Sequence, residues 1–482
     1  MRSSNVGVLY MTSVVPIILA GGVGARLWPV SRKSCPKQFA ALIGGFSLFQ
    51  QSVLRVQGDG FVKPLIVTSE EYRFLVSQQL NDLGVDADIV LEPEGKNTAP
   101  AILAAAIIAQ KREIDPLLLV MPSDHHIPDT KVFEKTVAEG LATAGRGGVV
   151  TFGVKPTRAE TGYGYIETLP EQNELCRPVK GFHEKPDYSL AVELYSSGLY
   201  LWNTGIFLFK AKTILALARR LQPQMLSVVV NAVENGNTDL GYFCISTAEW
   251  TLVKADSIDF AIMEKADNIF CVNFQSTWSD LGDWRAIADL MECDSNNNFV
   301  SQNSTSVDCK NTMLWSSGHR MRLTGLGLEN IVAVATDDAV LVANADRLQE
   351  VRKIVAALGS DGAQEATKHL KDYRPWGWFE SLVMLPSYQV KRLHVHPQSK
   401  LSLQSHKHRS EHWVVVAGRA TVFRDSEVFT LEPNTSVYIK AGQKHRLANE
   451  TDEPLTVIEV QTGSYLGEDD IIRFEDVYHR SK

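Results

Sequence analysis

The sequence predicts an α/β protein in three parts: an N-terminal doubly wound sheet, a small β-helix or β-roll, and a C-terminal β-barrel. Three observations lead to this prediction. Short apolar runs alternate with helix-like stretches up to residue 292, closely spaced β segments follow, and strand-like alternation dominates from Tyr373. A chain of 482 residues is too long for one ordinary core, and we place the domains at 12–292, 293–360 and 361–482.

The composition argues against several classes of protein. The net charge of −8 is spread along the chain, whereas general nucleic-acid and membrane-surface binders carry a basic face. No apolar run approaches the roughly 20 residues of a membrane span. The six cysteines are scattered and form no C-x-x-C pair, which favours reduced thiols in a cytoplasmic protein over a disulfide framework or a zinc knuckle.

The first residues allow two interpretations. Arg2, an apolar stretch and small residues near Ala20 imitate a signal peptide. Cleavage there would destroy the first strand and the loop after it. We therefore interpret the residues before Thr12 as an extension, with Met11 as an alternative start.

The N-terminal domain opens with the apolar run Val14–Leu19, which is typical of a buried parallel strand. Glycines follow it, and without a Cβ they let the backbone turn sharply and bring N–H groups close to a phosphate. Spaced cations come next, so the stretch predicts a polyphosphate-binding loop. A Walker A loop and a Rossmann fingerprint are excluded, because the Lys-Ser/Thr pair and the third glycine are not in place. The candidate ligands are Gly21, Gly22, Gly24, Arg26, Arg32 and Lys37.

Further strands are predicted at 64–68, 87–91, 117–121 and 149–154, and helices at 47–55, 71–80 and 98–111. Strands that alternate with helices form a parallel sheet, whose ligands bind beyond the carboxyl ends of the strands. Asp124 follows one such strand and Asp280 is a second carboxylate, so this pair is the candidate Mg²⁺ site. Asn97 or Thr98 is expected to cap the helix after the third strand.

An acid and a base stand side by side at Glu184-Lys185, directly before Pro186. On a strand the two side chains would point to opposite faces, so only a bend at Pro186 would bring both into one site. Upstream, Gly162 and Gly164 would let a sugar ring press against the backbone, with a β-bulge as the alternative.

The stretch 298–346 contains short β segments at 312–315, 331–335 and 339–343, without a sharp repeat period. Such closely spaced strands favour a β-helix or β-roll. An amphipathic helix is predicted over 348–358.

The C-terminal part concentrates candidate metal ligands. Gln404 and His406 are two residues apart and share one face of a strand. Glu411 and His445 would complete a cage of two imidazoles, one carboxylate and one amide oxygen, which suits a divalent ion of the Zn, Co, Ni or Mn type. For a His-x-His pair alone, two surface histidines on an edge strand would be the alternative.

Two strings resemble known families. The glycine loop with its continuation through Leu27-Trp28-Pro29 to Pro36-Lys37-Gln38-Phe39 resembles the signature of sugar-1-phosphate nucleotidyltransferases, and of mannose-1-phosphate guanylyltransferases in particular. The stretch 404–413 resembles the type II phosphomannose isomerase signature. Its spacing to Gly418 and to 442–449 matches the two-part pattern of cupin barrels, with Gln404 in the place of the first histidine. Over nearly its whole length the chain is similar to bifunctional mannose-1-phosphate guanylyltransferase/mannose-6-phosphate isomerases.

The resemblance implies two reactions. GMP would pass from GTP to mannose 1-phosphate, giving GDP-mannose and pyrophosphate, with Mg²⁺ on Asp124 and Asp280. The cupin would interconvert mannose 6-phosphate and fructose 6-phosphate on a metal such as Zn²⁺ or Co²⁺, held by Gln404, His406, Glu411 and His445.

The resemblance also implies roles for single residues. Gly164, Glu184, Lys185 and Asn203 would bind the sugar phosphate, and Arg32 and Asn97 would join the glycine loop in binding the nucleotide. The implied catalytic residues are Arg26, Lys37, Asp124, Lys185, Asp280 and Arg409.

Two alternatives stay open. The cupin could be a binding or oligomerisation module without turnover, and the N-terminal domain could serve another hexose 1-phosphate or nucleotide. The expected partners are GTP and the sugar phosphates, with a homodimer left open. The expected process is nucleotide-sugar synthesis for polysaccharides.

Overall fold

The computed structural model describes residues 13–22, 24, 26–169, 175–318, 321–476 and 478. The N-terminal extension before Thr12 and the alternative start at Met11 concern residues outside this range. The chain divides into two compact units, Met1–Arg73 with Gln79–Ala366, and Phe74–Gln78 with Thr367–Lys482. The three domain boundaries placed from the sequence stay a prediction.

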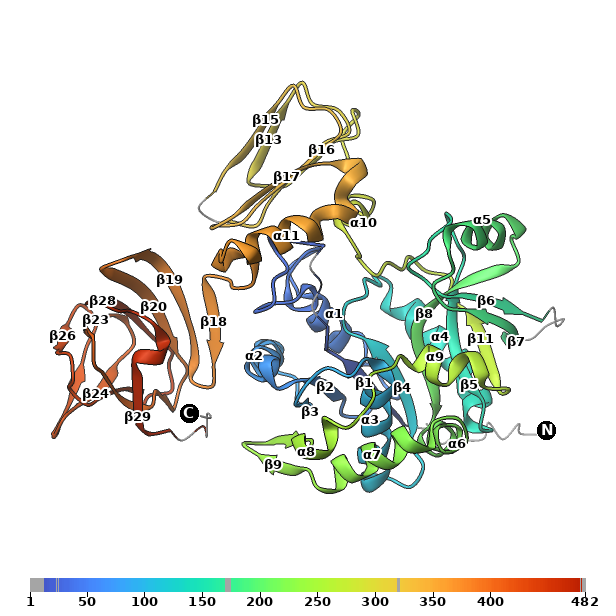
Figure 1. Ribbon diagram of the computed structural model, residues 1–482, viewed down its shortest axis with the longest axis horizontal. Helices are drawn as coiled ribbons and strands as arrows, with labels where there is room; N and C mark the ends of the chain where they lie inside the picture. The colour runs from blue at the N-terminus through green and yellow to red at the C-terminus, as the bar shows by residue number, and fades with distance from the viewer. Residues whose placement is uncertain are drawn as a thin grey trace, which may run out of the picture. The chain divides into compact units, whose positions relative to one another are not determined.

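An 11-stranded sheet forms the centre of the first unit (Figure 1). Its order is β5 (Val149–Val154), β11 (Ile269–Asn273), β7 (Cys176–His183), β6 (Tyr165–Thr168), β8 (Tyr200–Lys210), β4 (Leu117–Pro122), β1 (Val14–Leu19), β2 (Leu65–Ser69), β3 (Asp88–Glu92), β10 (Tyr242–Cys244) and β9 (Asn237–Asp239). The run β4-β1-β2-β3-β10 is parallel, as expected of a doubly wound fold. Strand β8 lies antiparallel to β4 and extends the sheet beyond that run.

Helices alternate with these strands along the chain, and several of them begin at a side-chain cap. The helices are α1 (Leu48–Leu54), α2 (Arg73–Leu83), α3 (Thr98–Arg112), α4 (Thr130–Gly145), α5 (Tyr188–Ser197), α6 (Ala211–Leu221), α7 (Pro223–Glu234), α8 (Thr247–Trp250), α9 (Ile258–Ala261) and α10 (Trp284–Ala288). Helix α3 begins at its Asn97 cap, whose side chain accepts a bond from the Thr98 N–H, and it ends with Lys111 and Arg112 in its last turn.

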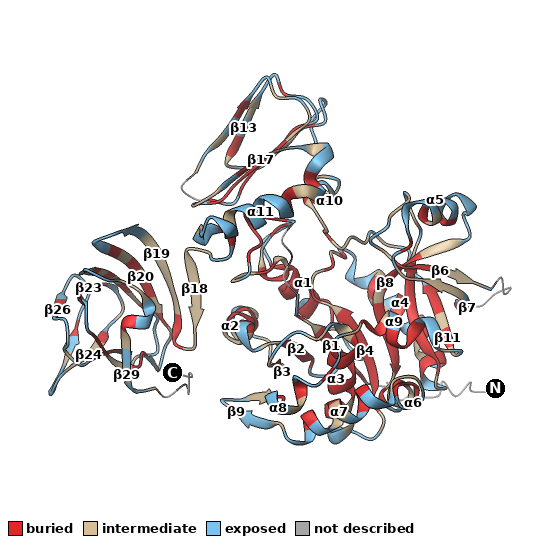
Figure 2. Ribbon diagram, viewed as in Figure 1, coloured by how far each residue is buried: buried red, intermediate tan, exposed pale blue. Residues whose placement is uncertain are grey.

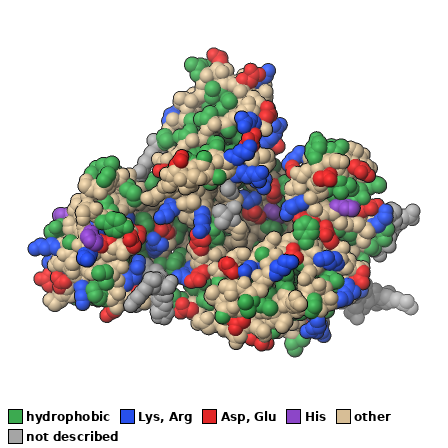
Figure 3. Space-filling model, in the orientation of Figure 1, with side chains coloured by type: hydrophobic (Ala, Val, Ile, Leu, Met, Phe, Trp, Pro, Cys, Tyr) green, Lys and Arg blue, Asp and Glu red, His purple; other side chains and the backbone are tan. Residues whose placement is uncertain are grey.

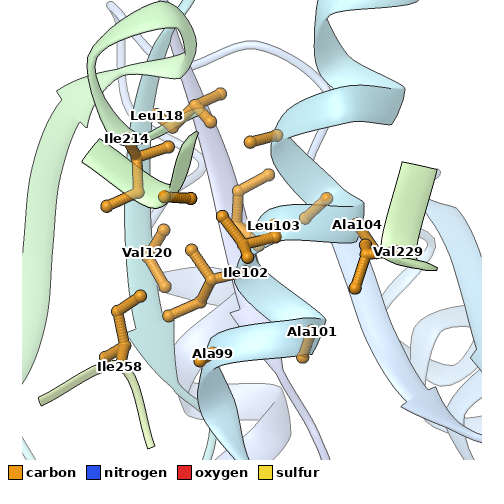
Figure 4. Close-up of a cluster of buried hydrophobic side chains, with 14 of the residues drawn as sticks. Ala99, Ala101, Ile102, Leu103, Ala104, Leu118, Val120, Ile214, Val229 and Ile258 are labelled. Atoms are coloured by element: carbon orange, nitrogen blue, oxygen red, sulfur yellow. The ribbon is translucent and has the colours of Figure 1, made fainter. Parts of the chain in front are cut away.

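The main core lies between α3 and the sheet. Figure 4 shows Ile102 and Leu103 of α3 among Leu118 and Val120 of β4, with Ile214 of α6 beside them. These side chains are at most 1% exposed, and Figure 2 shows the central strands as largely buried. Because both faces of the parallel strands are covered, their sequences are apolar without alternation.

A small β-helix follows in the same unit, which confirms that prediction. Strands β12 (Phe299–Val300), β14 (Met313–Ser316) and β16 (Ile331–Ala335) stack in parallel, and β17 (Val340–Asn344) closes that sheet antiparallel. Strands β13 (Ser304–Val307) and β15 (Leu323–Leu326) form a second parallel sheet. Phe299 pairs with Met313 and Met313 with Val332, so the two coils differ in length, which explains why the sequence shows no fixed period. The 3₁₀ segment Ala345–Glu350 then leads into α11 (Val351–Ser360).

The second unit is a β-barrel of two sheets. The first has the order β18 (Lys371–Arg374), β19 (Gly377–Leu385), β20 (Tyr388–Val395), β28 (Leu455–Gly463), β23 (Arg409–Ala417) and β26 (Ser436–Ile439). The second has the order β25 (Glu427–Leu431), β24 (Ala420–Arg424), β27 (His445–Asn449), β22 (Leu403–His406) and β29 (Ile471–Glu475), with β21 (Ser399–Lys400) paired to β27. Inward residues such as Val395, Trp413 and Val422 fill the space between the sheets.

In the part of the chain that the structure describes, no helix combines the length and the apolar character needed to cross a bilayer. On the face drawn in Figure 3, acidic and basic side chains are interspersed and do not gather into one basic surface.

Candidate functional site

Two loops from distant parts of the sequence meet beyond the carboxyl end of β4. The backbones of His126 and Ser279 exchange hydrogen bonds of 2.9 and 3.2 Å, and this bridge places Asp124 and Asp280 on adjoining loops. Lys37 reaches both loops. Its ammonium lies 3.0 Å from Oδ2 of Asp124 and donates to the backbone carbonyl of Asp280. The structure thus brings together a cation and two acids that the sequence analysis selected separately.

Asp124 is charged at neutral pH. Burial would raise the pKa of this carboxyl, but the charge and the hydrogen bond of Lys37 oppose that effect, and the pKa lies below its usual value. Burial also lowers the pKa of His125, and its Nδ1 accepts a 3.3 Å hydrogen bond from the Trp278 indole. His125 therefore acts as a neutral acceptor that fixes the loop around Asp124.

Tyr163 contacts Asp280, which the sequence analysis did not foresee. The phenol donates a 2.6 Å hydrogen bond to Oδ1, and the Gly282 N–H donates to the same oxygen. Burial and Asp280 raise the pKa of Tyr163, so the phenol stays protonated. The only local signal was the position of Tyr163 between Gly162 and Gly164, which does not reveal a partner 117 residues away.

The glycine loop lies directly after β1, as expected. Gln38 donates 3.2 Å hydrogen bonds to the carbonyls of Gly21 and Gly22, and Ser31 donates to the carbonyl of Gly24. Gly22 has φ +93, a conformation that L side chains rarely adopt. Glycine at position 22 therefore suits the turn that the loop makes.

The assignment of Arg32 to the nucleotide needs correction. Its guanidinium is 0% exposed and forms a bidentate pair with Asp338, with distances of 2.5 and 2.6 Å. It also donates to the Pro29 carbonyl and to Thr336. A guanidinium enclosed in this way is not presented to a ligand at the loop. The spacing of cations after the glycines suggested a phosphate ligand. The sequence could not reveal the actual partner of Arg32, because Asp338 lies 306 residues further along the chain.

Arg26 and Asn97 occupy different settings. Arg26 is exposed and donates a 3.2 Å hydrogen bond to Gln349. Asn97 follows β3, so it lies at the carboxyl edge of the parallel strands, and its side-chain oxygen caps α3 through the Thr98 N–H. The cap is a structural use of Asn97. Its contact with a nucleotide stays a prediction.

A second cluster gathers the residues predicted to bind the sugar phosphate. Asn203 donates its backbone N–H to the Gly164 carbonyl at 2.8 Å, and its amide donates to Asp259 at 3.0 Å. An ideal Cβ on Gly164 would lie 2.5 Å from Oε2 of Glu184, so glycine leaves that carboxylate its room. Asp259 was missed, and burial together with Glu184 raises its pKa to about 7.

The bend between Glu184 and Lys185 falls at Lys185 itself. Strand β7 ends at His183, and Lys185 has φ +46, a conformation uncommon for a residue with a side chain. Its ammonium consequently lies 3.1 Å from Oε1 of Glu184. Glu184 is 7% exposed and Lys185 is 57% exposed, so the pair presents its positive end to solvent.

The second unit contains a compact group of buried ligand atoms. Nε2 of His406 lies 2.9 Å from Oε1 of Glu411, and Nε2 of His445 lies 3.6 Å from Oε2. One ligand atom from each of the three residues falls within 4.8 Å of the others. The Nδ1–H of His445 donates to the Gln443 carbonyl, which aims the lone pair of Nε2 into the group.

This group fits a divalent metal. Among the described residues, Nε2 of His445 is a buried polar atom without a hydrogen-bond partner, and a cation would satisfy it. Burial would raise the pKa of Glu411, but the hydrogen bond from His406 and the charge of Arg409 oppose this effect and the pKa is lowered, so the carboxylate is ionised. Gln404 turns its amide nitrogen to His406 at 3.5 Å, and Ser402 donates to its oxygen. As a metal ligand, Gln404 would first have to rotate its amide.

Arg409 is buried beside the cage. Its Nε donates to Oε1 of Glu411 at 3.3 Å and its Nη1 to the Gly467 carbonyl at 2.8 Å, so it orients a candidate metal ligand. A polar pocket adjoins the cage, and its lining includes Arg374, Lys391, Gln404, Arg409, Glu411 and Arg473. Four cations line the pocket together with the carboxyls of Glu411, Glu459 and Glu468, and this small excess of positive charge beside the candidate cage would favour an anionic ligand.

Glu459 and Gln461 were not foreseen. Gln461 donates to both Glu411 and Glu459, and the Trp413 indole is shared by the same two carboxyls. Burial and Glu411 raise the pKa of Glu459 to about 8. These residues lie on β28, which pairs with β23 only in the folded barrel, so no motif marks them.

Comparisons with known proteins agree with this geometry. A family model described as nucleotidyl transferase matches residues 15–297, one described as mannose-6-phosphate isomerase C-terminal matches 361–476, and a MannoseP isomerase/GMP-like beta-helix model matches 302–358. The fold and its two sites therefore define a nucleotidyltransferase joined to a cupin-type isomerase domain.

Relatives of known name extend along the whole chain. Xanthan biosynthesis protein XanB of Xanthomonas campestris is 46% identical over 98% of this chain and 100% of its own length. Mannose-1-phosphate guanylyltransferase of Salmonella muenchen is 40% identical over 96% of this chain and 98% of its own. The crystal structure of mannose-1-phosphate geranyltransferase from Thermus thermophilus covers 72% of this chain and 99% of its own, with 30% identity and a TM-score of 0.64. The chain belongs to the family of mannose-1-phosphate guanylyltransferases that carry a mannose-6-phosphate isomerase C-terminal domain.

Proposed function

We propose that the first unit transfers GMP from GTP to mannose 1-phosphate. One observation carries the proposal: next to the glycine loop, Lys37 joins the two loops that hold Asp124 and Asp280. A cation between two acidic loops can receive a triphosphate together with a divalent metal. The cluster of Glu184, Lys185 and Asn203 supplies a place for the second substrate.

The reaction is an in-line displacement. A phosphate oxygen of mannose 1-phosphate attacks the α-phosphorus of GTP, and the bond from that phosphorus to the β-phosphate oxygen breaks, releasing pyrophosphate. The protein forms no covalent bond in this scheme, and positioning together with charge neutralisation supplies the catalysis. Gly21, Gly22 and Gly24 cradle the triphosphate with backbone N–H groups, and Arg26 and Lys37 neutralise its charge.

The residues present also fit Mg²⁺. Carboxylates and phosphate oxygens are its usual ligands, and Asp124 and Asp280 are the acids at the loop. When bound, the ion neutralises charge that builds on the reacting phosphate oxygens. Asp124 contributes because it is already ionised, and Tyr163 contributes because it fixes one oxygen of Asp280. Lys185 holds the phosphate of the sugar, and Glu184 and Asn203 bond its hydroxyls.

We further propose that the barrel interconverts mannose 6-phosphate and fructose 6-phosphate. His406, Glu411 and His445, with Gln404 after rotation of its amide, would hold a metal such as Zn²⁺ or Co²⁺, which supplies polarisation of the open-chain carbonyl. Arg409 orients Glu411 and faces the pocket, where it would receive the phosphate or stabilise an enediolate.

A direct assay tests both activities. The purified chain is incubated with GTP, mannose 1-phosphate and Mg²⁺, and pyrophosphate is measured. Glucose 1-phosphate, ATP and UTP serve as the competing substrates, and a higher kcat/KM for any of them would replace the proposed pair. In a separate reaction fructose 6-phosphate is supplied with Zn²⁺, Co²⁺ or Mn²⁺. Absence of mannose 6-phosphate with every metal would favour a barrel that only binds.

The setting of these reactions is part of the proposal. All six cysteines are free thiols, which suits synthesis of GDP-mannose in the cytoplasm. The product would serve polysaccharide synthesis, the process named in the XanB relative.

A further inference from the structure

The β-helix is built into the segment that follows the glycine loop. Leu27, Trp28 and Val30 share one apolar core with Trp284 of α10 and with the β-helix residues Met313, Trp315, Val334 and Leu341. The Trp284 indole donates to the Trp28 carbonyl at 3.0 Å, and its ring lies 5.3 Å from that of Trp315. The loop that is proposed to hold the triphosphate is thus continuous with a core shared by both parts of the unit.

One buried ion pair fixes this joint. Arg32 lies between the glycine loop and Lys37, and it forms its bidentate pair with Asp338, in the turn between β16 and β17. The Arg32 side chain is 0% exposed and that of Asp338 is 14% exposed, so water screens the pair little. The same guanidinium donates to the Pro29 carbonyl at 2.9 Å. Asp338 therefore helps to fix the backbone between Arg26 and Lys37, together with the shared apolar core.

A second contact comes from the 3₁₀ segment Ala345–Glu350, which ends the β-helix, and it reaches the proposed site directly. Gln349 accepts a 3.2 Å bond from Arg26 and donates to Asp283, three residues after Asp280. An ideal Cβ on Gly282 would lie 3.2 Å from Asp280 and 3.7 Å from Arg26, so these groups surround one spot. The β-helix thus contacts both sides of that spot through a single amide.

We propose that Asp338 and Gln349 of the β-helix are positioning residues for nucleotidyl transfer. Asp338 acts through Arg32 and sets the path of the phosphate loop, and Gln349 sets the direction of Arg26. The inference rests on the proposed function of the first unit, and it assigns the β-helix a share in GTP binding. Mannose 1-phosphate binds at a different cluster and is not affected.

The experiment compares Asp338→Asn, Asp338→Glu and Gln349→Ala with the wild type in pyrophosphate release. We expect Asp338→Asn to raise the KM for GTP by about 10-fold or more, since small displacements of a binding group are costly. The KM for mannose 1-phosphate stays within about 2-fold of wild type in the same measurement. Asp338→Glu restores part of the GTP affinity because it keeps the charge. Gln349→Ala raises the KM for GTP by about 3-fold, because the exposed hydrogen bonds to Arg26 and Asp283 are lost.

Controls separate positioning from folding. Glu350→Gln removes an exposed ion pair with Arg347 in the same segment, and it leaves both KM values unchanged. If Asp338→Asn does not fold, Gln349→Ala, at an exposed position, decides the question. A wild-type KM for GTP in Asp338→Asn overturns the inference. If that variant does not fold, a wild-type KM for GTP in Gln349→Ala overturns it. An equal rise in the KM values for GTP and mannose 1-phosphate overturns it as well. A wild-type chain without guanylyl transfer overturns the proposed function instead.

Discussion

The phenol of Tyr163 donates a 2.6 Å hydrogen bond to Oδ1 of Asp280, an acid 117 residues further along the chain. We expect Tyr163→Phe to lower kcat for guanylyl transfer by about 10- to 100-fold, since a hydrogen bond to a charged group is worth about 1.5–3 kcal/mol. The Mg²⁺ concentration needed for half-maximal rate should rise as well. Steady-state kinetics over a Mg²⁺ titration check both effects. Tyr188→Phe, at an exposed tyrosine, is the control, and an unchanged Mg²⁺ dependence in Tyr163→Phe would separate Tyr163 from the metal.

Lys185 should act on one substrate only. Its ammonium is exposed at the end of β7 and lies beside Glu184, on a different loop from Lys37. Lys185→Ala is expected to raise the KM for mannose 1-phosphate by about 10- to 100-fold, because a charge-assisted contact to the phosphate is lost, while the KM for GTP changes by less than about 2-fold. Initial-rate kinetics with each substrate varied in turn measure this. Lys180→Ala, on the strand that precedes Lys185 and paired with Glu167, is the matched control, and an unchanged sugar KM removes Lys185 from the site.

The cage of the barrel should determine the metal content of the protein. His445→Ala removes a ligand whose Nε2 is aimed into the group of His406 and Glu411. We expect the bound divalent metal to fall about 10-fold or more after dialysis, because the remaining side chains hold an ion more weakly without this imidazole. Elemental analysis of the purified chain measures it without any activity assay. His412→Ala, at an exposed histidine on β23 directly after Glu411, should keep the wild-type content. Equal metal in both variants would contradict the assignment.

Glu92 should make stability depend on pH. It is buried at the end of β3, and burial raises its pKa from 4.5 to about 8. The native state therefore holds the proton more tightly than the unfolded chain. As the pH rises from about 4.5 to about 8, the unfolded chain releases its proton first, so the native state loses stability over that range. Above about pH 8, Glu92 causes no further loss of stability.

Glu92→Gln removes this dependence because its amide stays neutral. We expect its Tm to exceed that of the wild type by at least about 2 °C at pH 9, with a smaller difference at pH 5. Thermal denaturation of both proteins at the two pH values checks the sign. Glu94→Gln, at an exposed carboxylate nearby, controls for the loss of a charge. A difference that grows toward low pH would contradict the raised pKa.

Much of the fold followed from local pattern. Apolar runs without alternation predicted β1 to β4, and the Asn97 cap and alanine-rich run predicted α3, because strand burial and helix capping depend on neighbouring residues. The spacing of His406 and Glu411 on β22 and β23, with His445 on β27, brought three candidate ligands together correctly. These ligands could be grouped from the sequence because they lie on strands that the two-part cupin pattern already places next to one another.

The sequence by itself thus determined the order of the three parts and the loop after β1, and it selected candidate ligands whose binding roles stay predictions. The tertiary structure alone decided what Arg32 contacts, that Tyr163 bonds to Asp280, and that the bend beside Glu184 falls at Lys185. The reason is physical. A capping bond or an apolar face is defined within a few residues, whereas the charge and hydrogen-bond partners of a buried side chain are set by whichever distant segment the fold packs against it.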